Sequence, residues 1–159
     1  MTLFTNRTAF LAGAAGAVGR VLSRLLVADG WRVVGMTRSP AKAADLAAIG
    51  VEPAIVDAFD RDTLVRVVTD ARPDVVVHQL TDLAAAIYPR HFERDFANTN
   101  RLRTEATRYL LAAAEAAGAR RLVTQSFAGW PYARTGGPVK TEADPFDPAP
   151  WKRFRSWRR

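Results

Sequence analysis

The chain has 159 residues, which is enough for one domain with a substantial core but not for two large domains. Hydrophobic residues make up 48% of it, which is a globular composition, and no run approaches the roughly 18 apolar residues of a membrane-spanning helix. The lack of cysteine excludes disulfides, thiol nucleophiles and thiolate metal sites, and it fits a reducing compartment, so we expect a cytoplasmic protein.

The net charge of +7 is concentrated at the C-terminal end. The last nine residues carry five cations and no acid, so the rest of the chain is left with a charge of +2. Aromatic residues between these cations could hold a nucleic acid, but a solvated end is the simpler interpretation, because the body of the chain has no nucleic-acid-binding pattern. We expect neither a nucleic acid nor a membrane as partner. His78 and His91 have no metal-ligand spacing with carboxylates, so no metal is expected.

A glycine-rich turn lies close to the N-terminus. Gly13, Gly16 and Gly19 are spaced three apart, after an apolar run over 9–12 that indicates a buried strand. The next segment has helical spacing of its apolar residues, which are Val18, Val21, Leu22, Leu25 and Leu26. A strand, a glycine turn and a helix in this order are typical of a phosphate site, because the helix N-terminus offers free N–H groups to an anion.

In such a site each glycine has its own role. Gly13 would make the tight turn, Gly16 would let a pyrophosphate approach, and Gly19 would allow close packing of the helix on the sheet. The neighbouring backbone would also contact the cofactor, through Ala14, Ala15, Ala17 and Val18. One alternative is an ordinary turn of a βα unit. Another is a signal peptide, which is disfavoured because glycine dilutes the apolar part and the helical pattern continues through Arg20 and Arg24.

Strands and helices are predicted to alternate along the chain. The expected strands are 8–12, 31–37, 51–56, 75–77 and 122–124, and the expected helices are 17–29, 41–49, a helix capped by Asp60 and ended by Pro73, and a long helix over 93–117. This alternation predicts an α/β fold with a Rossmann-like, doubly wound parallel sheet of about five strands in the order 3-2-1-4-5. We expect this dinucleotide-binding domain to cover 1–126, and an irregular, proline-rich segment with a basic tail to cover 127–159.

The topology brings side chains that are far apart in sequence to one edge of the sheet. After the second expected strand the chain has Arg38, Ser39 and Lys42 and no acid, which favours NADP over NAD, although a surface arginine is the alternative. Asp57 could accept a hydrogen bond from the adenine amino group or could cap a loop. Ser126 follows the fifth strand at the same edge.

The end of the fourth strand would pass under the ribose on the nicotinamide side. We assign Gln79 and Leu80 to the cofactor site on this ground. His78 is interpreted as a buried histidine with satisfied hydrogen bonds rather than as a base. Asn100 is a poor helix former inside the long helix, so it has either a hydrogen-bonding role at the site or a surface position.

Together these residues resemble the extended short-chain dehydrogenases/reductases, and more narrowly the NAD-dependent epimerase/dehydratase group. The resemblance rests on the glycine turn, Arg38, Asp57, the strand ending at His78, Asn100 before an alanine-rich helix, and the 122–126 segment. The 139–145 stretch resembles the acidic-proline segment that follows the fifth strand in that family. The resemblance covers about 8–148, which corresponds to the first half or so of a typical member.

The resemblance implies an oxidoreductase or epimerase that acts on a small carbonyl compound or a sugar nucleotide. In the family a Tyr-x-x-x-Lys pair and a Ser or Thr surround the substrate, and Ser126 matches that Ser, although a shift of one residue would put Phe127 there. None of the chain's tyrosines (Tyr88, Tyr109, Tyr132) has a lysine four residues on. Two alternatives therefore stay open. One is a nucleotide-sensing module without catalysis, and the other is a shortened fragment, which predicts exposed apolar surface.

Overall fold

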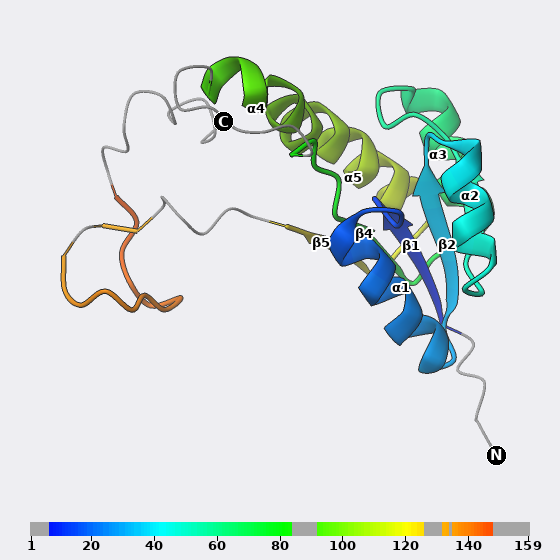
Figure 1. Ribbon diagram of the computed structural model, residues 1–159, viewed down its shortest axis with the longest axis horizontal. Coiled ribbons are helices and arrows are strands. Elements are labelled where there is room, and N and C mark those ends of the chain that lie inside the picture. The colour runs from blue at the N-terminus through cyan, green and yellow to red at the C-terminus, as the bar shows by residue number, and fades with distance from the viewer. Residues whose placement is uncertain (1–6, 84–91, 126–131, 134, 148–159) are drawn as a thin grey trace. The chain divides into compact units, whose positions relative to one another are not determined.

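The computed structural model describes residues 7–83, 92–125, 132, 133 and 135–147. Backbone contacts divide the chain into two units, Met1–Thr124 and Gln125–Arg159, which are described separately. The first unit holds a five-stranded parallel sheet in the order β3-β2-β1-β4-β5, which confirms the predicted topology (Figure 1). Its strands are β1 (Thr8–Ala12), β2 (Arg32–Thr37), β3 (Glu52–Ile55), β4 (Val75–His78) and β5 (Arg121–Thr124).

The helices also lie where they were predicted, to within two residues at either end. They are α1 (Ala17–Ala28), α2 (Pro40–Ala47), α3 (Arg61–Ala71), α4 (Phe92–Arg101) and α5 (Thr107–Ala116). The long helix predicted over 93–117 is not uniform, because a π-helical turn, η2 (Leu102–Ala106), separates α4 from α5. No helix in the described ranges is long and apolar enough to cross a membrane.

Local signals explain where α3 begins and ends. The Asp60 carboxylate accepts a hydrogen bond from the Thr63 N–H at 3.2 Å, so Asp60 is the N-cap that the sequence predicts. At the other end Arg72 adopts a left-handed conformation with φ of 48°. Pro73 follows directly and has no N–H with which to continue the helix.

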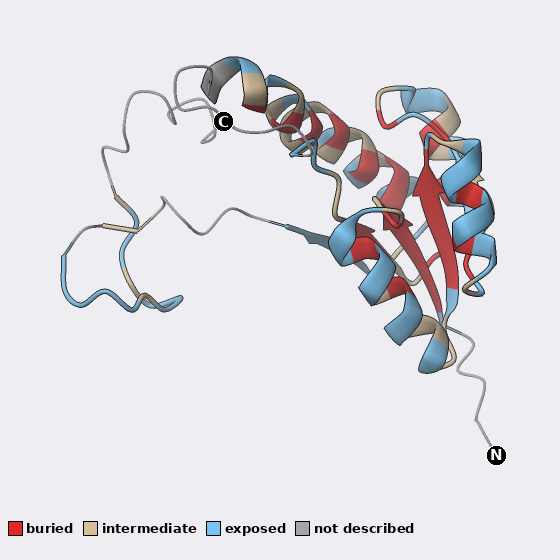
Figure 2. Ribbon diagram, viewed as in Figure 1, coloured by how far each residue is buried: buried red, intermediate tan, exposed pale blue. Residues whose placement is uncertain are grey.

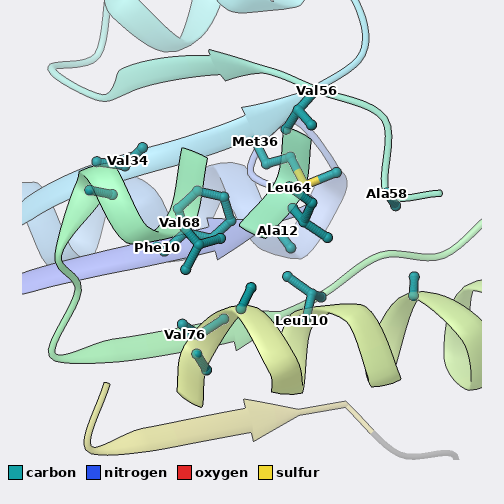
Figure 3. Close-up of a cluster of buried hydrophobic side chains, with 14 of the residues drawn as sticks. Phe10, Ala12, Val34, Met36, Val56, Ala58, Leu64, Val68, Val76 and Leu110 are labelled. Carbon is teal, nitrogen blue, oxygen red and sulfur yellow. The ribbon is translucent and has the colours of Figure 1, made fainter. Parts of the chain in front are cut away.

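Side chains of successive strand residues point to opposite faces of the sheet, and each face has its own core. The larger core joins strand residues to α3 and α5, and Figure 3 shows Phe10, Met36 and Val76 packed against Leu64, Val68 and Leu110. On the opposite face, Leu11, Val33 and Val77 pack with residues of α1 and α2. All five residues of β1 are buried, as expected for a central strand that is covered on both faces.

The apolar pattern of α1 predicts the helix correctly, but only part of the predicted stripe is covered, since Leu22 and Leu26 pack partly buried against the second core. Val18, Val21 and Leu25 are 56%, 59% and 64% exposed, while Gly19 and Ser23 are buried. Figure 2 shows the ribbon of α1 mostly in the colour of exposed residues, with short buried stretches. The contact with the sheet is narrower than the predicted apolar stripe, because the helix turns its small residues inward. Val123 on the edge strand β5 is also 49% exposed, so apolar surface lies open on this sheet face.

The second unit has little regular structure in its described residues. Tyr132 and Phe146 form an isolated antiparallel bridge with their rings 5.6 Å apart, and the Ala133 N–H donates to the Pro145 carbonyl at 2.8 Å. The residues 132, 133 and 135–147 include no helix. The basic tail over 151–159 lies outside the described residues.

Candidate functional site

A cavity of about 500 Å³ lies at the carboxyl ends of the first four strands. That volume is in the range of small-molecule sites, and the position is the switch point at which doubly wound sheets bind ligands. Four segments and one helical residue line it: the glycine turn (Gly13, Ala15, Gly16), the end of β2 with the start of α2 (Met36, Thr37, Arg38, Ser39, Lys42), the turn after β3 (Asp57, Ala58, Phe59), the segment after β4 (Gln79, Leu80, Thr81, Asp82), and Leu102.

Gly13 makes the turn between β1 and α1. Its φ is +92°, a value that side-chain-bearing residues rarely adopt, and its carbonyl accepts a hydrogen bond from the Gly16 N–H at 3.0 Å. A Cβ on Gly13 would lie 2.8 Å from the backbone C and O atoms of Gln79 and 3.1 Å from the Leu80 nitrogen. The turn and the segment after β4 are therefore in backbone contact, which only glycine permits here.

Gly19 packs the first turn of α1 against the glycine turn. A Cβ at this position would overlap the Gly13 carbonyl oxygen and lie 2.9 Å from the Ala14 Cα. The close packing that the sequence predicts is therefore made with the turn itself. Gly19 is buried in this contact and does not line the cavity.

The N-terminus of α1 opens toward the cavity without a side-chain cap. Gly16 is its N-cap and lines the cavity, and the first turn has no acidic residue. The first N–H groups of a helix have no intrahelical partner, so here they stay available to an anion, which the partial positive charge of the helix also favours. This donor set fits the pyrophosphate of a dinucleotide.

The β2 end of the cavity is basic. Arg38 and Lys42 both line it and both are exposed at its surface. Between them Ser39 caps α2, because its hydroxyl accepts a hydrogen bond from the Lys42 N–H at 3.4 Å and Pro40 occupies the first turn. The cap holds the start of α2 beside the cavity, so the two cations share one wall of it.

Asp57 belongs both to the cavity and to the turn after β3. It lines the cavity, and its carboxylate also accepts a hydrogen bond from the Phe59 N–H at 2.9 Å, which shapes the turn after β3. The Phe59 ring is covered by the Arg101 guanidinium at 3.7 Å from the ring centroid. Glu105 holds that guanidinium through two hydrogen bonds of 2.7 and 3.0 Å.

His78 is buried and has partners for both ring nitrogens, as predicted. Nδ1 accepts a hydrogen bond from the Leu80 N–H at 3.1 Å, so the ring proton is on Nε2, which donates to the Leu102 carbonyl at 3.2 Å. Burial lowers the pKa of His78. The hydrogen bond to Leu102 opposes this shift in the pKa, and the charge of Arg103 adds to it. The imidazole is therefore neutral, and it connects β4 to η2.

The cavity joins some of the predicted cofactor residues and leaves others outside. Those that line it are Gly13, Ala15, Gly16, Arg38, Asp57, Gln79 and Leu80. Those that do not are Ala14, Ala17, Val18, Gly19 and Asn100. Ala14 and Gly19 are buried beneath the turn, and Val18 points to solvent. Ser126, the predicted catalytic residue, lies outside the described residues.

Asn100 is half-buried, and its backbone carbonyl accepts a hydrogen bond from the Thr104 hydroxyl at 2.9 Å. The side-chain oxygen of Asn100 is buried without a hydrogen-bond partner among the described residues. Sequence reasoning missed Phe59, Thr81, Asp82 and Leu102 as lining residues. Thr81 and Asp82 directly follow predicted residues, but Leu102 comes from a helix and had no local signal.

Comparison with known proteins identifies the family. A family model described as NAD(P)H-binding matches residues 13–153. A Streptomyces protein named 3-diazoavenalumate denitrifying reductase is 42% identical over 135 residues, which are 85% of this chain and 42% of that protein. The chain thus spans less than half the length of this curated relative.

Solved structures share the fold. UDP-glucose-4-epimerase from Stenotrophomonas maltophila, with bound NAD and formylated UDP-arabinopyranose, has a TM-score of 0.72 at 18% identity over 89% of this chain and 43% of that one. A short-chain dehydrogenase/reductase superfamily protein from Agrobacterium tumefaciens, with bound NAD, is 31% identical over 74% of this chain and 32% of its own, with a TM-score of 0.52. The sheet order, the glycine turn and the family match agree, and the chain belongs to the NAD(P)H-binding family, with the Rossmann fold of the NAD-dependent epimerases and short-chain dehydrogenases/reductases.

Proposed function

We propose that this chain binds NADP(H) in the cavity at the carboxyl ends of its strands. The observation that carries the proposal is the combination of an uncapped helix N-terminus at Gly16 with two cations, Arg38 and Lys42, on one wall. The pyrophosphate would lie at the helix N-terminus. Because β2 and β3 lie on one side of β1 and β4 on the other, the adenosine half would lie over β2 and β3, and the nicotinamide half over β4.

The preference for NADP over NAD follows from the charges after β2. A carboxylate there would accept hydrogen bonds from the ribose 2′-hydroxyl of NAD and would repel a 2′-phosphate. Residues 36–40 contain no acid, whereas Arg38 and Lys42 line the cavity and would pair with a phosphate instead. Asp57, on the next strand end, is left to accept from the adenine amino group.

For the whole protein we propose a reductase that transfers hydride to a small organic substrate. The name of the Streptomyces relative refers to a diazo compound and to a reductive, denitrifying reaction, so a diazo compound is the substrate class we favour. Bound NADPH would supply the hydride. With a diazonium group the hydride forms a new C–H bond at the carbon, the C–N bond breaks with its electron pair going to nitrogen, and dinitrogen and NADP⁺ are released.

Such a reaction develops no negative oxygen, and it needs no phenol to protonate one. A carbonyl reductase would require a proton donor at that step. The diazo proposal and the carbonyl alternative therefore differ in their need for an acid.

Cofactor binding is tested by titrating the purified chain with NADPH and NADH. We expect NADPH to bind with a Kd of order micromolar and NADH more weakly. Arg38→Ala should lower the affinity for NADPH about ten- to a hundredfold, because a charge-assisted hydrogen bond to phosphate is lost. The affinity for NADH should stay nearly unchanged. Arg66→Ala, at an exposed position on α3 away from the cavity, is the matched control. Equal affinity for both cofactors, unaltered by Arg38→Ala, would contradict the NADP preference.

The reaction is tested by NADPH consumption with a diazo compound and, separately, with a carbonyl compound. Release of dinitrogen in equal amount to NADPH oxidised supports the diazo reaction. Consumption with the carbonyl compound alone would overturn it.

A further inference from the structure

We infer that His78 and Thr99 are positioning residues that hold the Gln79–Asp82 segment in place as the nicotinamide-side wall of the cavity. This inference rests on the proposed function, because it assigns the wall to the nicotinamide half of the dinucleotide. The segment leaves β4 and contributes four residues in a row to the lining. Each end of it is attached by a buried side chain to the same long helix.

The first attachment is made by the His78 imidazole. Its Nδ1 accepts from the Leu80 N–H at 3.1 Å and its Nε2 donates to the Leu102 carbonyl at 3.2 Å. His78 is only 4% exposed, so water does not compete well for these bonds. Leu102 is the first residue of η2, so the π-helical turn lies where the helix receives the imidazole. Such turns often occur at functional sites.

The second attachment is made by the Thr99 hydroxyl. It accepts a hydrogen bond from the Asp82 N–H and donates one to the Asp82 carbonyl, both at 3.0 Å. The Thr99 hydroxyl therefore satisfies both the N–H and the carbonyl of Asp82, and because Thr99 is fully buried, water cannot easily replace it. The neighbouring Asn98 amide also donates to the Asp82 carboxylate at 2.6 Å.

The two attachments restrict the segment at the place where it meets the glycine turn. The Gln79 backbone lies so close to Gly13 that no Cβ fits between them. A shift of the segment would therefore either collide with the turn or widen the cavity over β4. The β2 and β3 walls belong to other segments and would not move with it. We therefore expect losses at these two residues to affect the nicotinamide half of the ligand selectively.

The experiment compares NADPH with 2′,5′-ADP, which contains only the adenosine half. Thr99→Val removes the hydroxyl at nearly constant shape, and we expect it to weaken NADPH about three- to tenfold and 2′,5′-ADP less than twofold. Thr99→Ser restores the hydroxyl and should restore NADPH affinity. Thr107→Val is the matched control, because the Thr107 hydroxyl donates to the Arg103 carbonyl within the same long helix and does not contact the segment.

Two substitutions divide the functions of His78. Asn places an acceptor near the Nδ1 position and can bond the N–H two residues on, so His78→Asn keeps the contact to Leu80 and loses the one to Leu102. Gln places a donor near the Nε2 position, so His78→Gln keeps the contact to Leu102 and loses the one to Leu80. The bond to Leu80 is the one that holds the segment directly, so we expect His78→Gln to weaken NADPH binding more than His78→Asn does. Neither variant should change the binding of 2′,5′-ADP. Measurements are made well below the Tm of every variant.

Each result decides the inference. Unchanged NADPH affinity in Thr99→Val and His78→Gln would overturn it, and so would an equal loss for NADPH and 2′,5′-ADP, since that would show a general effect on the fold. If the wild-type chain binds 2′,5′-ADP but gains nothing from the rest of NADPH, the assignment of the wall is wrong while the adenosine site stands. If the wild-type chain binds neither ligand, the proposed function fails and the inference fails with it.

Discussion

Replacing Gly13 by alanine tests the contact on which the site is built. The substitution has two separate costs. A side-chain-bearing residue at φ of +92° is strained, which costs about 1–3 kcal/mol. The new methyl group would also lie 2.8 Å from the Gln79 backbone, and overpacking of this kind costs about 1–3 kcal/mol more. Together the two costs should lower the free energy of unfolding by about 2–6 kcal/mol, out of the 5–15 kcal/mol typical of a domain.

Two control variants separate these costs. Gly118 has φ of +67°, and no described atom lies within 4 Å of the place that a Cβ would take, so Gly118→Ala carries the strain without the collision. Gly137 has open space and no positive φ, so Gly137→Ala should leave stability within about 0.5 kcal/mol. Urea unfolding followed by far-UV circular dichroism gives the free energies, and NADPH titration of the folded fraction gives the effect on binding. If Gly13→Ala costs no more than Gly118→Ala, the backbone contact between the glycine turn and Gln79 is not as close as described.

Three further predictions concern the core, the pH dependence and the outer surface. Leu110→Ala should lower the free energy of unfolding, measured in urea, by about 2–5 kcal/mol, because Leu110 is fully buried. Leu111 is 46% exposed, so Leu111→Ala should lower it far less, and equal losses would contradict the assigned face of α5. Burial lowers the pKa of His78 in the folded chain below its ordinary 6.5, so below that pH the unfolded chain binds a proton more readily than the folded chain does. The urea midpoint should therefore drop between about pH 7 and pH 5.5. A drop of the same size in His78→Gln would show that another group causes it. Replacing Val21 and Leu25 by glutamine should change stability little and reduce the binding of a hydrophobic dye, since both side chains are exposed; a large loss of stability would show that they are covered in solution.

The fold could be predicted because its signals are local and repeated. The elements are marked by apolar strands such as 75–77, by the Asp60 cap and by the glycines that end several of the helices. The handedness of parallel connections then determines the order of the strands. The π-helical turn at Leu102–Ala106 could not be predicted, because its residues have ordinary helical spacing. The exposed side of α1 was missed for a related reason. Periodicity shows that a helix has an apolar side, but the width of the contact depends on what packs there, and α1 turns Gly19 and Ser23 toward the sheet.

The two halves of the cavity differ in how far the sequence reveals them. On the β2 and β3 side, the informative residues directly follow their strands, and their chemistry is recognisable one residue at a time, as with Arg38 and Asp57. On the β4 side, the same reasoning finds Gln79 and Leu80 but not what holds them. That depends on Thr99 and on the Leu102 carbonyl, which are brought into contact only by the packing of the long helix against the sheet.

This difference has a consequence for substitutions that change the cofactor preference. Under the proposed function, a change at Arg38 would remove a contact with the 2′-phosphate and leave the frame of the cavity intact, because Arg38 is exposed and the frame on that side is the sheet. A change at Thr99, which does not line the cavity, would act through the Gln79–Asp82 segment, whose attachment points are 17 residues or more away in sequence. We therefore expect Arg38→Ala and Thr99→Val to be additive in their effects on NADPH affinity, since they share no partner and act on opposite halves of the ligand. A double variant whose loss differs from the sum of the two single losses by more than about 0.5 kcal/mol would show that the two walls of the cavity are coupled.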